Sequence, residues 1–128
     1  MIILDENIIE SQAQLLRSWR ITFRQIGQNV GRAGMKDDEL IPLLHSLRRP
    51  TLFTRDLRFY TRDEPHAGFC IVCLGVEQGE VASFVRRFLK QPDLDTQSKR
   101  MGAIITASQS GLRVKRLNET SETELKWA

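Results

Sequence analysis

Acidic side chains follow two short apolar segments of this chain, in a pattern that can create a metal site. Residues 1–4 are apolar and run directly into Asp5, and residues 51–53, a threonine followed by two large apolar side chains, are closely followed by Asp56. Apolar segments of this length are typical of buried strands. Open α/β sheets bind ligands beside the carboxyl ends of their strands. We therefore expect Asp5 and Asp56 to contribute to one site.

Two further acids, Asp37 and Asp38, precede apolar residues at helical spacing and are expected to open a helix. Acids at a helix start also favour the positive end of the dipole, so a purely structural role is an open alternative. If this helix start lies at the same edge as Asp5 and Asp56, the carboxylates form a cluster. Clustered carboxylates need a counter-charge, and Mg²⁺ or Mn²⁺ suits oxygen ligands. Such an ion would serve phosphodiester hydrolysis.

The segments that would position these acids alternate between strand and helix patterns. Strands are expected over 1–4, 21–23, 51–53 and 68–74, helices over 8–19, 37–47, 57–60 and 80–89, and a hairpin over 101–106 and 112–117. Asn7 is expected to cap the first helix, and 92–98 to form a loop. This order predicts a small α/β sandwich with a mostly parallel sheet.

The length of 128 residues predicts a single domain over 1–117, followed by a polar tail over 118–128 that is disordered or ordered only on a partner. The apolar segments are too short to span a membrane, and no basic leader precedes the first of them, so we expect a cytoplasmic protein. The net charge is +3, and most basic residues are arginines, many in the first half. These arginines form either an ordinary solvated face or a rim that attracts a polyanion.

Cys70 and Cys73 form a C-x-x-C inside the most apolar segment. Side chains three apart on a strand point to opposite faces, so this pair is poorly placed to chelate zinc. His45 and His66 are the only histidines that could add ligands. We expect two buried, free cysteines, as is usual in a reducing compartment.

Three short motifs carry a family resemblance: Leu4-Asp5-Glu6-Asn7, Asp37-Asp38-Glu39-Leu40 and Thr54-Arg55-Asp56. In this order, and with an apolar strand, one helix and a basic hairpin after them, they resemble the reduced PIN-like nucleases related to VapC-type toxins. The resemblance implies a PIN-like three-layer sandwich with a mostly parallel central sheet and a C-terminal β-hairpin. It also implies Mg²⁺ or Mn²⁺, endoribonuclease activity on RNA, an antitoxin partner and a possible homodimer.

Carried over by position, the resemblance assigns Asp5, Asp38 and Asp56 as catalytic and metal-binding residues. Counting residues back from the third motif favours Asp38 as the middle acid. The position of Asp37 at the expected start of the helix favours Asp37 instead. Glu6, Asn7, Asp37 and Asp63 are possible accessory residues, and Arg55 and Arg58 are expected to contact RNA phosphates.

One position departs from the family pattern. The family often continues Thr-x-Asp-x-Asp-Phe, and Arg58 stands where the second acid is expected. Asp63 is a candidate substitute, or else an ordinary turn acid. The alternative function is therefore a catalytically weakened PIN-like module that binds nucleic acid or a partner protein. A phosphatase-like or phosphoacceptor domain is a third class, but the Asp-x-Asp that phosphatase chemistry needs after the first strand is missing.

Overall fold

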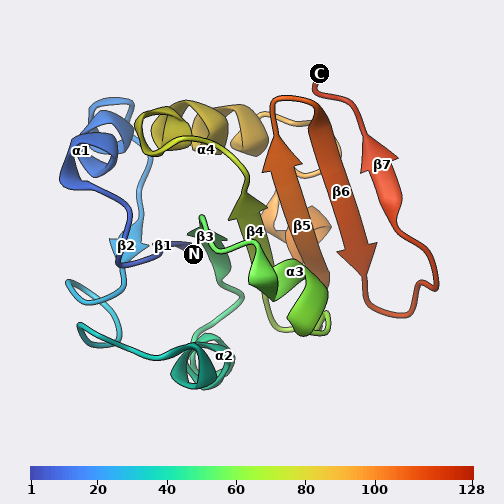
Figure 1. Cartoon of the computed structure of the whole chain (residues 1–128), viewed down its shortest axis with the longest axis horizontal. Coiled ribbons are helices and arrows are strands. Elements are labelled where there is room, and N and C mark those ends of the chain that lie inside the picture. The colour runs from blue at the N-terminus through green and yellow to red at the C-terminus, as the bar shows by residue number, and fades with distance from the viewer.

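One seven-stranded sheet runs through the computed structural model, which describes residues 1–128 (Figure 1). The strands are β1 (Ile2–Leu4), β2 (Arg24–Gln25), β3 (Thr51–Thr54), β4 (Cys70–Leu74), β5 (Ala103–Ser108), β6 (Gly111–Arg116) and β7 (Thr123–Leu125). Their order is β2-β1-β3-β4-β5-β6-β7. The pairs from β2 to β5 in this order are parallel, and the β5–β6 and β6–β7 pairs are antiparallel. The predicted α/β fold, mostly parallel sheet and terminal hairpin are confirmed.

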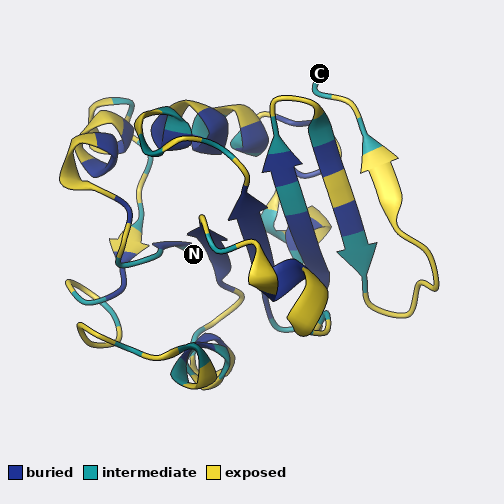
Figure 2. Ribbon diagram, in the orientation of Figure 1, coloured by how far each residue is buried: buried dark blue, intermediate teal, exposed yellow.

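Helices cover both faces of this sheet. They are α1 (Glu10–Ser18), α2 (Asp37–Ser46), α3 (Arg58–Arg62), the 3-10 helix η1 (Gln78–Glu80), α4 (Val81–Leu89) and α5 (Gln97–Arg100). One core lies between the sheet and helices α1 and α4, and a second, smaller core lies between the sheet and helices α2 and α3. The arrangement is a sandwich of three layers, with β3 and β4 buried along their whole length (Figure 2).

The central strands confirm the prediction for the cysteines. Cys70 belongs to the core beneath α1 and α4, whereas Cys73 belongs to the core beneath α2 and α3. Both thiols are free, and burial raises the pKa of each to about 12. The alternation of faces along β4 therefore separates the two sulfur atoms, as the strand geometry predicts.

Several boundaries differ from the sequence prediction. The strand expected at 21–23 forms at Arg24–Gln25 instead, because Ile21 and Phe23 pack against the core beside α1 and leave the pairing to their neighbours. The first helix begins at Glu10 with Ile9 in the cap position, so Asn7 is not its cap. Residues 97 and 98, expected in a loop, begin α5.

Residues 118–128, expected as a polar tail, complete the sheet. Strand β7 pairs with β6, and the Trp127 indole donates a hydrogen bond to the Ser108 carbonyl at 2.7 Å. The Trp127 ring also meets Phe84 of α4 edge-on, with 5.9 Å between centroids. These contacts anchor the end of the chain to the larger core.

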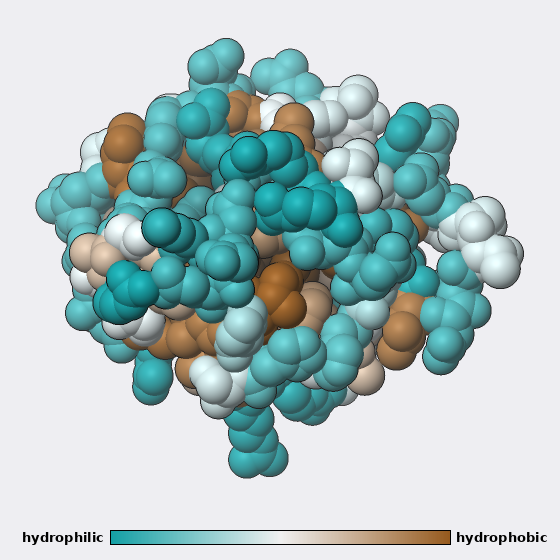
Figure 3. Space-filling model, turned by 60° about the horizontal axis from the view of Figure 1, so that its bottom comes forward, coloured by the Kyte–Doolittle hydropathy of each residue, from teal (hydrophilic) through white to brown (hydrophobic).

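The face drawn in Figure 3 is mostly hydrophilic, and its apolar atoms show in small, separate areas. None of the helices is long and apolar enough to cross a membrane.

Candidate active site

Asp5 and Asp56 lie together in a pocket of about 290 Å³ at the carboxyl ends of β1 and β3. These strands are parallel neighbours, and Leu4 of β1 pairs with Phe53 of β3. The Asp5 amide continues this pairing by donating to the Phe53 carbonyl at 3.0 Å. Parallel pairing therefore brings to one edge two acids that are far apart in the sequence. The pocket is lined by Asp5, Asn7, Ile8, Arg55, Asp56, Arg58 and Gln78.

A single buried hydroxyl connects the two acids. Thr54 is the last residue of β3 and is fully buried. Its Oγ1 donates to Asp5 Oδ2 at 2.8 Å and accepts a hydrogen bond from the Asp56 backbone amide at 3.1 Å. Sequence reasoning gave Thr54 no role, although its place in the Thr54-Arg55-Asp56 motif was the available signal.

A buried amide fixes the backbone on the other side of Asp5. Gln25 of β2 is 2% exposed, and its Nε2 donates to the carbonyl oxygens of Asp5, at 3.1 Å, and Ile8, at 2.9 Å. Both hydrogen bonds fix the turn that carries Asp5 from β1 toward α1. Sequence reasoning missed Gln25 as well, because its burial depends on the position of a two-residue strand.

The electrostatic environments of the two acids differ. Burial raises the pKa of Asp5, and the charge of Asp56 adds to this rise, while the hydrogen bond from Thr54 opposes it. Hydrogen bonds from Arg58 lower the pKa of Asp56. Asp56 is therefore already neutralised by a cation of the protein, whereas Asp5 takes part in none of the ion pairs.

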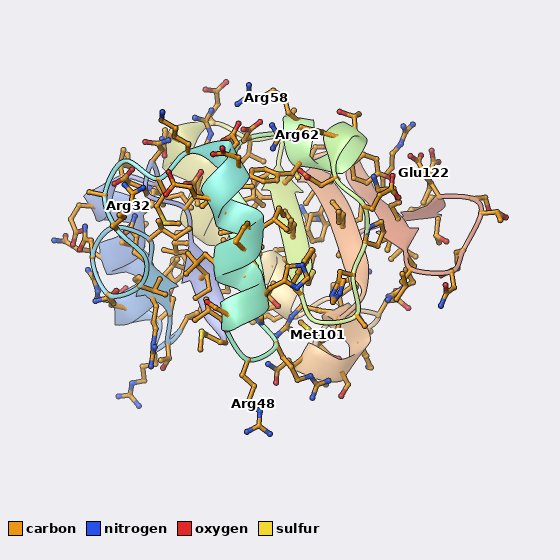
Figure 4. All side chains as sticks on the ribbon, turned by 90° about the horizontal axis from the view of Figure 1, so that it is seen from below. Arg32, Arg48, Arg58, Arg62, Met101 and Glu122 are labelled. Atoms are coloured by element: carbon orange, nitrogen blue, oxygen red, sulfur yellow. The ribbon has the colours of Figure 1, made fainter.

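Arg58 connects Asp56 to the start of α2. Its Nε and Nη2 donate to the two carboxylate oxygens of Asp56 at 2.9 and 2.8 Å, and Nη2 also reaches Asp37 Oδ2 at 3.2 Å. Arg62 binds the same Asp37 oxygen at 3.1 Å. Figure 4 shows Arg58 and Arg62 side by side at one end of α2, and Arg48 at the other end. Of the two candidates for the middle acid, Asp37 is the one connected to Asp56.

Of the other predicted site residues, Asn7 lines the pocket, whereas Asp37, Asp38, Glu6 and Asp63 do not. Asp38 is exposed and makes no side-chain hydrogen bond or ion pair. Both carboxylate oxygens of Glu6 accept from the Gly34 amide at 3.0 Å, so Glu6 anchors the glycine-containing loop before α2. Asp63 pairs with Arg62. Asn7 lines the pocket, and its carbonyl accepts from Gln78 Nε2 at 2.8 Å.

Arg55 stands between this pocket and a larger one of about 670 Å³ and lines both. Its Nε donates to the Val76 carbonyl at 2.9 Å, and its side chain makes no ion pair. The guanidinium is therefore fixed at one nitrogen, with its other donors free for a ligand. The larger pocket is lined by Arg55, Leu57, Leu74, Gly75, Val76, Glu77, Glu80, Ser108, Gln109 and Ser110.

The pocket fits a hard divalent cation by the type of its oxygen donors, but not by their present arrangement. The negative charge of Asp56 raises the pKa of Asp5, as a neighbouring like charge does, and a cation would relieve that repulsion. However, the structure contains no group of three or more acidic, histidine or cysteine side chains poised around one point. Both oxygens of Asp56 are instead taken by Arg58.

No family model, curated protein or solved structure matches the chain.

Proposed function

We propose that this protein is a PIN-like, metal-dependent endoribonuclease that hydrolyses RNA phosphodiester bonds at the pocket of Asp5 and Asp56. One observation carries the proposal: two acids that follow adjacent parallel strands line one pocket at the carboxyl edge of the sheet, and the Thr54 hydroxyl bonds to the carboxylate of Asp5 and the backbone amide of Asp56. This edge is where open α/β folds bind their ligands. The three-layer arrangement and the order of the motifs support the same assignment.

In this proposal Asp5 and Asp56 would hold Mg²⁺ or Mn²⁺, with Asp37 as the third acid. Asp37 is preferred to Asp38 because it shares the Arg58 guanidinium with Asp56. A bound divalent cation would neutralise phosphate charge and lower the pKa of the attacking water. Thr54 and Gln25 act as positioning residues that hold the carboxylate and the backbone of Asp5.

Arg55 is proposed to hold an RNA phosphate at the junction of the two pockets. Its guanidinium is oriented by the Val76 carbonyl and has no carboxylate partner. Such a group contacts the backbone of a strand without reading its bases. The larger pocket, whose lining includes Leu74 and Val76, would then receive the neighbouring nucleotide.

A role as the toxin of a toxin–antitoxin pair rests on the family resemblance alone, as do the antitoxin partner, a possible homodimer and action in the cytoplasm. Expression of the protein without a neighbouring antitoxin gene is then expected to arrest growth, and Asp56→Asn to relieve the arrest. Arrest by both proteins contradicts this part of the proposal.

A second function is favoured by one specific observation. The bidentate hydrogen bonds of Arg58 neutralise Asp56, which is what a module that no longer uses metal requires. In this alternative, the protein binds nucleic acid or a partner protein through the same edge without cutting.

The deciding experiment is cleavage of a labelled single-stranded RNA in Mn²⁺ and in EDTA, with Asp56→Asn in parallel. Glu119→Gln is a matched control, because Glu119 is an exposed acid on the β6–β7 loop and makes no ion pair. We expect Mn²⁺-dependent cutting by the wild type and by the control but not by Asp56→Asn. Binding of several RNAs without cutting favours the second function, and unchanged cutting by Asp56→Asn contradicts the assigned site.

A further inference from the structure

The Arg58 guanidinium occupies the position where a cation serving Asp56 and Asp37 would lie. Arg58 is the first residue of α3 and lies two positions after Asp56 in the sequence. Three of its donor contacts end on the carboxylates of Asp56 and Asp37, at 2.8 to 3.2 Å. Its backbone amide also donates to Asp56 Oδ1 at 3.0 Å. The loop therefore holds the acid and its own counter-ion within three residues.

The Arg58 side chain is nevertheless largely exposed to solvent. It is 70% exposed, whereas that of Asp56 is 21% exposed. It stacks on none of the aromatic rings, unlike Arg62, whose guanidinium lies 4.9 Å from the Phe59 ring centroid. An exposed ion pair is held only weakly, because water solvates the separated groups well. Rotation of this one side chain exposes both carboxylate oxygens of Asp56 to the pocket.

We propose that Arg58 is a displaceable counter-ion that occupies the cation position of the acid pocket, so that a divalent cation must expel it to reach Asp56. The proposal rests on the proposed function, since it concerns metal uptake at that site. Arg58 thereby lowers the affinity for metal in two ways. It takes both oxygens of Asp56, and its own positive charge stays nearby after displacement.

Arg62 provides a matched control on the same helix. It carries the same charge and contacts Asp37 at 3.1 Å, but it makes no contact with Asp56. If the effect of Arg58 comes only from general positive charge, removing either guanidinium must tighten metal binding equally. If it comes from occupation of the site, only Arg58 matters strongly.

The test is isothermal titration calorimetry, in which each purified protein is titrated with Mn²⁺ alone. We expect Arg58→Gln to bind Mn²⁺ up to about fivefold more tightly than the wild type, which is the factor that loss of one exposed ion pair gives. Arg62→Gln should tighten binding less than Arg58→Gln does, because Arg62 contacts only Asp37 among the proposed metal ligands and leaves both oxygens of Asp56 to Arg58. Arg58→Lys keeps the charge without the planar fork and should fall between Arg58→Gln and the wild type.

Equal affinities of Arg58→Gln and the wild type, weaker binding by Arg58→Gln, or equal tightening in Arg62→Gln overturn the inference. RNA cleavage by the wild type in any of these cases leaves the nuclease proposal standing. Absence of Mn²⁺ binding in all of the proteins overturns both. Tighter binding by Arg58→Gln without RNA cleavage supports the displaceable counter-ion and contradicts the nuclease.

Discussion

Replacement of Thr54 by valine removes the hydroxyl that connects the two acids while keeping the shape of the side chain. Oγ1 is bonded to Asp5 Oδ2 at 2.8 Å and to the Asp56 amide at 3.1 Å, and Thr54 is fully buried. The valine methyl fills the space of the hydroxyl but can neither donate nor accept. A carboxylate oxygen and a backbone amide thus lose their partners where water has little access.

The size of the effect follows from these two hydrogen bonds. A hydrogen bond to a charged group contributes about 1.5 to 3 kcal/mol and a neutral one about 0.5 to 1.5 kcal/mol, so Thr54→Val should lower the free energy of unfolding by about 2 to 4 kcal/mol. Thr54→Ser keeps both bonds and loses one buried methyl group, which costs about 1 kcal/mol. The serine variant is therefore the control that separates the hydroxyl from the packing.

The measurement is urea unfolding of wild type, Thr54→Val and Thr54→Ser at pH 7 and in acid. Because the Thr54 hydrogen bond favours the ionised carboxylate, its loss raises the pKa of Asp5 further. The difference in free energy of unfolding between Thr54→Ser and Thr54→Val should accordingly become smaller as the pH falls through the pKa of Asp5. Equal stability of the two variants at pH 7 would refute the assignment of Thr54 as the residue that holds Asp5.

Three other predictions concern the acid, the arginine and the cysteines. The folded-state pKa of Asp5 is raised above its ordinary value of 3.8, so its ionisation costs stability above that pKa, and the cost disappears as the pH falls below the unfolded value. Asp5→Asn should therefore raise the melting temperature at pH 7 but not near pH 3, and an equal gain at both values contradicts burial as the cause. Arg55→Gln should weaken binding of single-stranded RNA and reduce the log–log salt slope by about 0.7, measured by fluorescence anisotropy. Arg113→Gln, whose guanidinium already pairs with acidic side chains, should leave the slope nearly unchanged. Cys70 and Cys73, with thiol pKa values near 12, should resist iodoacetamide at pH 8 until urea unfolds the protein. Rapid alkylation of the folded protein, followed by mass spectrometry, would contradict their burial.

The sequence predicts the central strands and the meeting of Asp5 with Asp56 because both depend on strong local patterns. Apolar segments as continuous as β3 and β4 have few alternatives to a buried parallel strand. Once the strands are parallel neighbours, their carboxyl ends share an edge. The acids that follow them are then brought together by topology alone.

Other features depend on tertiary contacts that local patterns do not contain. Strand β2 consists of Arg24 and Gln25, which have no strand-like pattern and pair only because β1 offers an open edge. Strand β7 looks polar because both of its faces are largely exposed, and its pairing with β6 and the packing of Trp127 hold it in place. Likewise, the choice between Asp37 and Asp38 depends on which carboxylate faces Arg58, a matter of helix rotation.

The distribution of charge around the pocket gives the best physical reason to expect a ligand there. The partly exposed acids, Asp56 and Asp37, are neutralised by arginines of α3, whereas Asp5, whose pKa is raised by burial, has only the Thr54 hydroxyl and backbone amides. A sequence selected for stability alone would reverse this arrangement, because a buried carboxylate costs more than an exposed one. An amide at position 5 would keep the hydrogen bond from Thr54 without that cost. Proteins retain such a cost mainly where activity needs it.

The stability of Asp5→Asn therefore bears on function as well as on folding. A gain at pH 7 together with loss of Mn²⁺ binding would mean that Asp5 is kept for the cation, and a loss of stability would mean that it is kept for the fold.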